Sequence, residues 1–149
     1  RNKLAHELNK SMTDIEILID KGIEKAIDKA IYFLDTEKKF EPFCFLIQSD
    51  ACFTEVIPNK DEFHFEENIM VDAFKDFANE KLEEQSAEGF CITSTLQTFL
   101  KGEPIEALSI FFKFKNDHLP LKTRIYYFPY TFVNQKPFID FDSVFSSEG

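Results

Sequence analysis

The sequence of residues 90–132 is FCITSTLQTFLKGEPIEALSIFFKFKNDHLPLKTRIYYFPYTF. It contains three runs in which apolar and polar residues alternate, a pattern typical of β-strands. The runs span residues 90–100, 105–115 and 121–132, and turns rich in Gly, Pro, Asn and Asp separate them. Strands joined by short turns pair antiparallel. The stretch therefore predicts an antiparallel meander, which a short strand at residues 138–141 follows.

Two amphipathic helices precede the meander. The first is long, and apolar residues recur at every third or fourth position over residues 15–34. Thr13 and Glu16 have the spacing of a capping box, which predicts that this helix begins near Thr13. The second helix is expected at residues 66–85, with Gly89 as its C-terminal cap.

A pair of strands is predicted between the two helices. Residues 43–47, FCFLI, form an unbroken apolar run, which indicates a strand buried on both faces, and residues 52–57 return as a second strand. The predicted order is α-β-β-α-β-β-β, with the short last strand after it. We expect an α+β fold in which two helices cover one face of an antiparallel sheet of about five to six strands. Residues 1–149 are predicted to form one domain, frayed at residues 1–11 and 143–149.

Length and charge restrict the classes of partner. A chain of 149 residues with 44% hydrophobic residues can form a core without disulfides or a metal. The net charge of −10 argues against nucleic acid or an anionic membrane as a partner, and no apolar run approaches the roughly 20 residues that span a bilayer. Residues 61–88 carry ten acidic and two basic side chains, whereas residues 101–136 carry six basic and three acidic ones. An electrically polarised molecule is expected.

Residues that support catalysis or bind metals are sparse. Four glycines, none of them closely spaced, exclude the glycine-rich loops that cradle phosphates. The three histidines show no metal-ligand spacing; they are His6, His64 and His118. Cys44, Cys52 and Cys91 are widely spaced, which is typical of a reducing, cytoplasmic compartment. We predict no catalytic, cofactor-binding or metal-binding residues, and we favour a non-enzymatic protein over an enzyme.

The last two long strands are predicted to place cations and aromatic rings on one face. If residues 116–120 form the turn, Lys113 lies opposite Arg124, and Phe112 and Ile125 share the opposite, core face. The preceding strand fits this division when Thr93 lies beside Phe111. The outer face is then expected to be a candidate interaction surface that carries Phe111, Lys113, Lys115, Lys122, Arg124, Tyr126, Phe128 and Tyr130.

Three interpretations of this outer face are open. Long Lys and Arg side chains could cover the rings in solvent. Enrichment in Tyr, Phe and Arg is also typical of protein interfaces, either with an acidic partner or with a second copy. The third interpretation is a platform for single-stranded nucleic acid, which the acidic segment disfavours. We therefore predict a protein-interaction domain, for example an inhibitor or an immunity-like protein. A small enzyme or ligand-binding domain with a pocket between helices and sheet is the alternative.

Two short motifs carry a resemblance to known proteins. Glu41-Pro42-Phe43 opens a strand after a long helix, and Tyr127-x-Pro129-Tyr130 ends the third strand of the meander. This layout resembles small bacterial α+β proteins of unknown function over nearly the whole chain. The turn Ser49-Asp50-Ala51 departs from those proteins, which have a glycine there. The resemblance implies the fold and no activity. The acidic α+β character also resembles that of bacterial immunity proteins in general.

Overall fold

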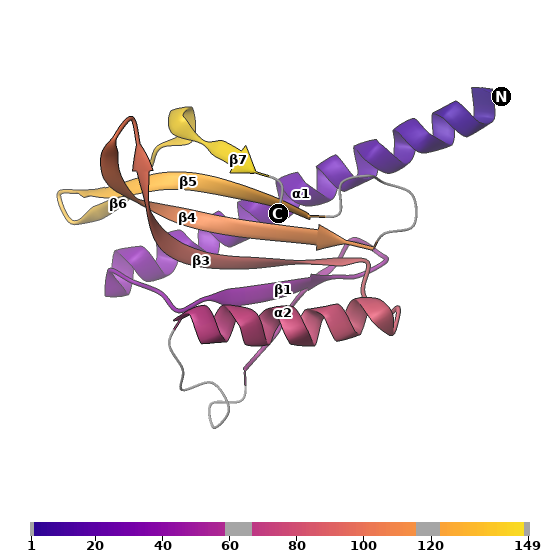
Figure 1. The fold of residues 1–149 in the computed structure, drawn as a ribbon, viewed down its shortest axis with the longest axis horizontal. Helices are drawn as coiled ribbons and strands as arrows, with labels where there is room; N and C mark the ends of the chain where they lie inside the picture. Colours follow the sequence, from indigo (N-terminus) through magenta and orange to yellow (C-terminus); the bar gives the residue numbers. More distant parts are fainter. Residues whose placement is uncertain (1, 59–66, 116–122, 148–149) are drawn as a thin grey trace.

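The computed structural model describes residues 2–58, 67–115 and 123–147 (Figure 1). Within them the α+β class and the order of the elements are as predicted. The helices are α1 (Asn2–Glu37) and α2 (Glu67–Glu83), and a 3-10 turn, η1, spans Phe141–Ser143. The strands are β1 (Phe43–Ile47), β2 (Phe53–Glu55), β3 (Gly89–Leu100), β4 (Glu103–Phe114), β5 (Thr123–Val133), β6 (Lys136–Ile139) and β7 (Phe145–Ser147).

The seven strands form one antiparallel sheet, in the order β2-β1-β3-β4-β5-β6. β6 and β7 both pair with the edge of β5 that faces away from β4. β6 pairs along residues 130–133 of β5, and β7 pairs along residues 125–127. The prediction of five or six strands was therefore too low, and residues 145–147 form a strand where a frayed end was predicted. Within the described residues, neither helix is long and apolar enough to cross a membrane.

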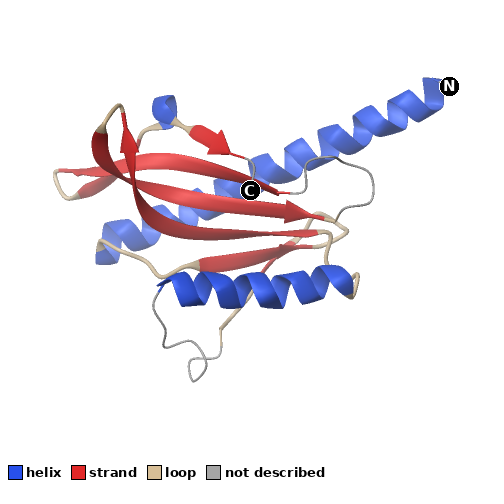
Figure 2. Ribbon diagram, viewed as in Figure 1, coloured by secondary structure: helices blue, strands red, loops and turns tan. Residues whose placement is uncertain are grey.

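The helices cover opposite faces of the sheet, which corrects the prediction that both cover one face (Figure 2). Along β1, Phe43 and Ile47 pack into a cluster with α1, whereas Cys44 and Leu46 pack into a second cluster with α2. Neighbouring residues of a strand point to opposite faces, so the two clusters lie on the two sides of the sheet. The unbroken apolar run of β1 is the sequence feature that requires cover on both sides.

The ends of the helices differ from the predictions. α1 begins at Asn2, so Thr13 lies within the helix and the predicted capping box does not start it. α2 ends at Glu83, and the left-handed residue behind it is Gln85, with φ of 61°. The backbone N–H groups of residues 85 and 86 donate to the carbonyl oxygens of residues 82 and 81, which is the Schellman pattern of helix ends. Gly89 instead begins β3.

Two-residue turns fix the register of the hairpins. Lys101 and Gly102 have positive φ angles of 52° and 80° and connect Leu100 to its partner Glu103. Positive φ at both central positions is typical of the turns whose twist matches paired strands. The register expected from the sequence, with Thr93 beside Phe111, is displaced by one residue from this pairing. Ile92, and not Thr93, is the partner of Phe111.

Thr93 is consequently in the core, on the face that α1 covers. It is fully buried between the sheet partners Phe43 and Ile110, and its hydroxyl has no hydrogen-bond partner among the described residues. A buried polar group without a partner costs about 1–3 kcal/mol. We predict that Thr93→Val, which keeps the shape and removes the hydroxyl, raises the free energy of unfolding by about 1 kcal/mol. Urea denaturation tests this, with Thr131→Val as the exposed control; a loss of stability would contradict it.

Candidate functional site

The residues of the predicted interaction surface do not share one face. In the β4–β5 register Lys113 is the partner of Thr123, and Phe112 is the partner of Arg124, one residue away from the predicted pairing. Phe111 and Lys113 therefore lie on the α2 face of the sheet, and four residues of β5 lie on the α1 face: Arg124, Tyr126, Phe128 and Tyr130. Lys115 follows the end of β4, and Lys122 lies outside the described residues.

On the α1 face the predicted surface is part of the core. Phe128 and Tyr130 are 4% and 9% exposed and belong to the cluster that packs against α1. The Tyr126 ring meets the fully buried Phe112 ring edge to face, with 6.0 Å between centroids. Arg124 donates to the Tyr126 hydroxyl at 3.0 Å. These side chains hold the sheet against α1, so they cannot form an exposed interaction surface together.

On the α2 face the other two residues contact the helix. Lys113 Nζ donates to Asn79 Oδ1 at 2.6 Å, and Lys75 Nζ lies 4.6 Å from the centroid of the Phe111 ring. Lys113 and Phe111 of β4 therefore pack against α2 rather than forming an open face together with β5.

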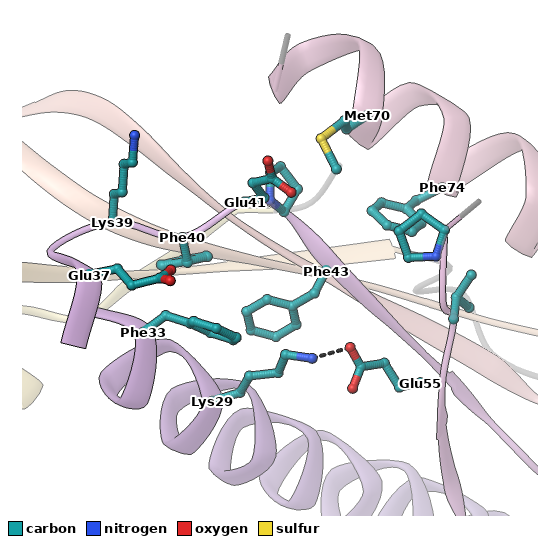
Figure 3. A pocket seen from close by; sticks show the side chains of 13 residues that line it. Lys29, Phe33, Glu37, Lys39, Phe40, Glu41, Phe43, Glu55, Met70 and Phe74 are labelled. Atoms are coloured by element: carbon teal, nitrogen blue, oxygen red, sulfur yellow. Dashed lines mark hydrogen bonds and ion pairs between the residues drawn. The ribbon is translucent and has the colours of Figure 1, made fainter. Parts of the chain in front are cut away.

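A pocket of about 510 Å3 lies where α1, β1, β2 and α2 meet (Figure 3). The last turns of α1 form one wall, and the start of β1 forms the next. The end of β2 and the first half of α2 close the other side. The lining residues are Lys29, Phe33, Glu37, Lys39, Phe40, Glu41, Pro42, Phe43, Glu55, Val56, Pro58, Met70 and Phe74. The alternative interpretation of the sequence expects a pocket between helices and sheet, and its ligand-binding role stays a prediction.

Lys29 is the central polar residue of this pocket. Its Nζ forms an ion pair with Glu55 of β2, which Figure 3 marks with a dashed line. The same nitrogen lies 5.0 Å from the centroid of the Phe43 ring and 5.9 Å from the centroids of the Phe33 and Phe45 rings. The ammonium is thus held by a carboxylate and by the faces of aromatic rings, both of which attract a cation.

Further charged groups stand at the rim of the pocket. Glu37, Lys39 and Glu41 are exposed, and they flank the buried Phe40 and Pro42. In Figure 3 the Glu41 carboxylate lies on the side of Met70, and the Glu37 carboxylate lies near Phe40 and Phe33. The pocket therefore combines aromatic walls and the central Lys29–Glu55 pair with further charges at its mouth.

The cysteines offer no activated nucleophile. Cys44 and Cys91 are buried in neighbouring strands on opposite faces of the sheet. Burial raises the pKa of Cys91 to about 12 and also raises the pKa of Cys44. Cys52 is exposed, and a hydrogen bond with the Asp50 side chain, together with its negative charge, raises the pKa of this thiol too. A raised pKa lowers the reactive thiolate fraction.

We predict that a disulfide exchange reagent such as DTNB modifies only Cys52 in the folded protein and modifies all three cysteines in denaturant. Asp50→Asn should accelerate the modification of Cys52 at pH 8, because loss of the carboxylate lowers the thiol pKa and raises the thiolate fraction. Asp28→Asn is the matched control, since Asp28 lines the same groove beside Cys52. Fast modification of a second thiol under native conditions would contradict the buried positions.

Among the described residues, α2 covers only part of its face of the sheet. The cluster under α2 contains residues of β1 and β3, with Phe111 of β4 at its margin. Beyond Phe111, the half-buried Ile125 and Tyr127 of β5 point to this same side. The Tyr127 ring stacks on the Phe145 ring of β7 at 4.7 Å. The uncovered sheet surface, defined as Phe111, Ile125, Tyr127 and Phe145, is the nearest structural counterpart of the predicted outer face.

The pocket had little signal in the sequence. Its residues come from four elements, and Lys29 lies outside the apolar stripe of the first helix. The spacing of Lys29, Phe33 and Glu37 by four residues puts them on one helical stripe, beside the core stripe. The Glu41-Pro42-Phe43 motif, on which the family resemblance rests, also lines the pocket. His64 and His118 lie outside the described residues. No protein-family model, curated protein or solved structure matches the chain, so the candidate site rests on its own geometry.

Proposed function

We propose that this protein binds a small ligand in the pocket between α1, the β1–β2 hairpin and α2. The observation that carries the proposal is an open pocket of about 510 Å3, lined by aromatic rings together with the Lys29–Glu55 pair. Ligand sites typically enclose about 300–1,000 Å3, with mainly apolar walls and a few polar groups that orient the ligand. The proposal is one of binding and assigns no reaction.

The pocket supports this function better than the predicted interaction surface does. Phe40, Phe43 and Phe74 contribute ring surface, and all three are held by the core, so the walls are largely preformed. Preformed walls reduce the entropy that ligand binding must overcome. Lys29 and Glu55 sit at the inner wall with side chains that are 24% and 33% exposed, within reach of a bound molecule.

A pocket-filling variant tests the proposal. Val56 lines the pocket and is half-buried, so Val56→Trp should fill it, whereas Ile57, its neighbour, is 76% exposed. We expect benzyl alcohol at millimolar concentration to shift the NMR signals of Lys29, Phe33 and Glu55 in the wild type and in Ile57→Trp. The shifts should disappear in Val56→Trp. Equal shifts in both variants, with spectra that show both are folded, would place the ligand elsewhere.

Self-association through the uncovered sheet surface is a second candidate, and the half-buried aromatic stack of Tyr127 and Phe145 favours it. Half-exposed rings on an open sheet are typical of surfaces that bind proteins. Light scattering should then show a dimer in the wild type and a monomer for Tyr127→Glu. Tyr32→Glu, on α1 and 62% exposed, is the control. A wild-type monomer at all concentrations would exclude this candidate.

The compartment is likewise a proposal. We place the protein in the reducing cytoplasm, and the positions of its cysteines support this. Cys44 and Cys91 are free thiols on opposite faces of the sheet, where they cannot form a disulfide with each other without unfolding of the core.

A further inference from the structure

We infer that the ligand of the pocket is a small organic cation, an ammonium group attached to an apolar body. This inference rests on the proposed function and names the class of molecule that the pocket accepts. Three observations carry it: the ring faces that line the pocket, the balance of charge at its mouth, and the charge of the whole chain.

The aromatic rings of the pocket present their faces to a cation. Lys29 Nζ lies over Phe43 at 5.0 Å and over Phe33 at 5.9 Å, so the chain already places an ammonium group against these rings. The face of an aromatic ring carries partial negative charge, which attracts cations and repels anions. Phe43 is buried beneath Lys29, whereas Phe33 is only half-buried, so a ligand ammonium would reach the open part of the Phe33 ring on the side of the Glu37 carboxylate.

The charged residues of the pocket leave an excess of carboxylate. Lys29 and Lys39 oppose Glu37, Glu41 and Glu55, which gives a net charge of −1. Because Glu55 already neutralises Lys29, the groups left at the mouth are two carboxylates and Lys39. In Figure 3 the Lys39 ammonium points away from the Phe43 ring, whereas the Glu37 carboxylate lies near Phe40 and Phe33.

The charge of the whole chain acts in the same direction. At −10, the protein attracts cations and repels anions over distances of about 10 Å at moderate ionic strength. A carboxylate or phosphate ligand would compete with Glu55 for Lys29 and would meet the carboxylates of Glu37 and Glu41 at the mouth. The pocket therefore disfavours an anion of the same size and shape.

Three probes of nearly the same shape test the inference. Benzylammonium, benzyl alcohol and benzoate share the ring and differ in charge at pH 7. We expect NMR titration to give the highest affinity for benzylammonium, about tenfold above that for benzoate, with benzyl alcohol between them. The preference for benzylammonium should shrink as salt is added, because the carboxylates at the mouth are exposed.

Charge-removing variants locate the effect. Glu37→Gln combined with Glu41→Gln should weaken benzylammonium binding by about threefold to tenfold, which is the range for exposed ion pairs, and should leave benzyl alcohol binding unchanged. Glu103→Gln, an exposed carboxylate on β4 remote from the pocket, is the matched control and should change neither.

The outcomes separate the two proposals. If none of the three probes shifts the pocket signals, the proposed ligand-binding function fails. If benzoate binds best, or if the double variant binds benzylammonium as tightly as the wild type does, the pocket binds ligands but the inferred cation preference is overturned. Highest affinity for benzylammonium that depends on Glu37 and Glu41 supports both.

Discussion

Phe128→Ala is expected to lower the free energy of unfolding by about 3–5 kcal/mol, the usual cost of truncating a buried aromatic ring. Phe128 is 4% exposed and packs on the α1 face of β5. Truncation removes its transfer free energy and leaves a cavity that the strands around it can close only in part. Urea denaturation followed by circular dichroism measures the change.

Phe138→Ala is the matched control for this experiment. Phe138 lies on β6, next to β5, and is 55% exposed, so its truncation should cost less than about 1 kcal/mol. The comparison also decides between the two registers of the β4–β5 pair. In the register predicted from the sequence Phe128 lies on the open face, and both variants would then lose similar, small amounts of stability.

The strands of the meander could be predicted from the sequence, whereas their faces could not. The alternation over residues 90–132 located β3, β4 and β5 to within about two residues at each end. The faces depend on register, and a displacement by one residue exchanges them. For β3 and β4 the two-residue Lys101-Gly102 turn sets the observed register, which is one residue away from the predicted one.

The prediction of which sheet face each helix covers was wrong for a different reason. The amphipathic pattern predicted that each helix has one buried stripe, but such a pattern does not say which face of the sheet receives it. The buried run of residues 43–47 was evidence for cover on both sides, and the structure assigns α1 to one side and α2 to the other.

The candidate site is less predictable than the fold because it depends on contacts between distant segments. Lys29 and Glu55 are 26 residues apart, and Met70 and Phe74 of α2 complete the pocket from beyond the next loop. A lysine next to the apolar stripe of an amphipathic helix is normally predicted to be exposed to solvent. Only the approach of the β1–β2 hairpin to α1 gives Lys29 its carboxylate and its aromatic rings.

Gly22→Ala is expected to destabilise the protein by about 1–2 kcal/mol, although alanine normally stabilises a helix relative to glycine by about 0.5–1 kcal/mol. A Cβ atom on Gly22 would lie 2.6 Å from Cε1 and 2.8 Å from Cζ of Phe112. The Phe112 ring is fully buried, lies parallel to the Phe114 ring and meets Tyr126 edge to face, so it has little room to move. Overpacking of this kind costs about 1–3 kcal/mol.

Two further variants show whether the close approach of α1 to the sheet is the cause. Asp20→Ala, at an exposed position of the same helix, should be neutral or slightly stabilising, because only helix propensity changes there. Phe112→Leu should remove most of the additional cost of Gly22→Ala in the double variant, since the smaller side chain vacates the space that the new methyl group needs. If Gly22→Ala stabilised the protein instead, α1 would have to lie farther from β4 than the structure shows. The wall of the pocket that α1 supplies would then also lie farther out.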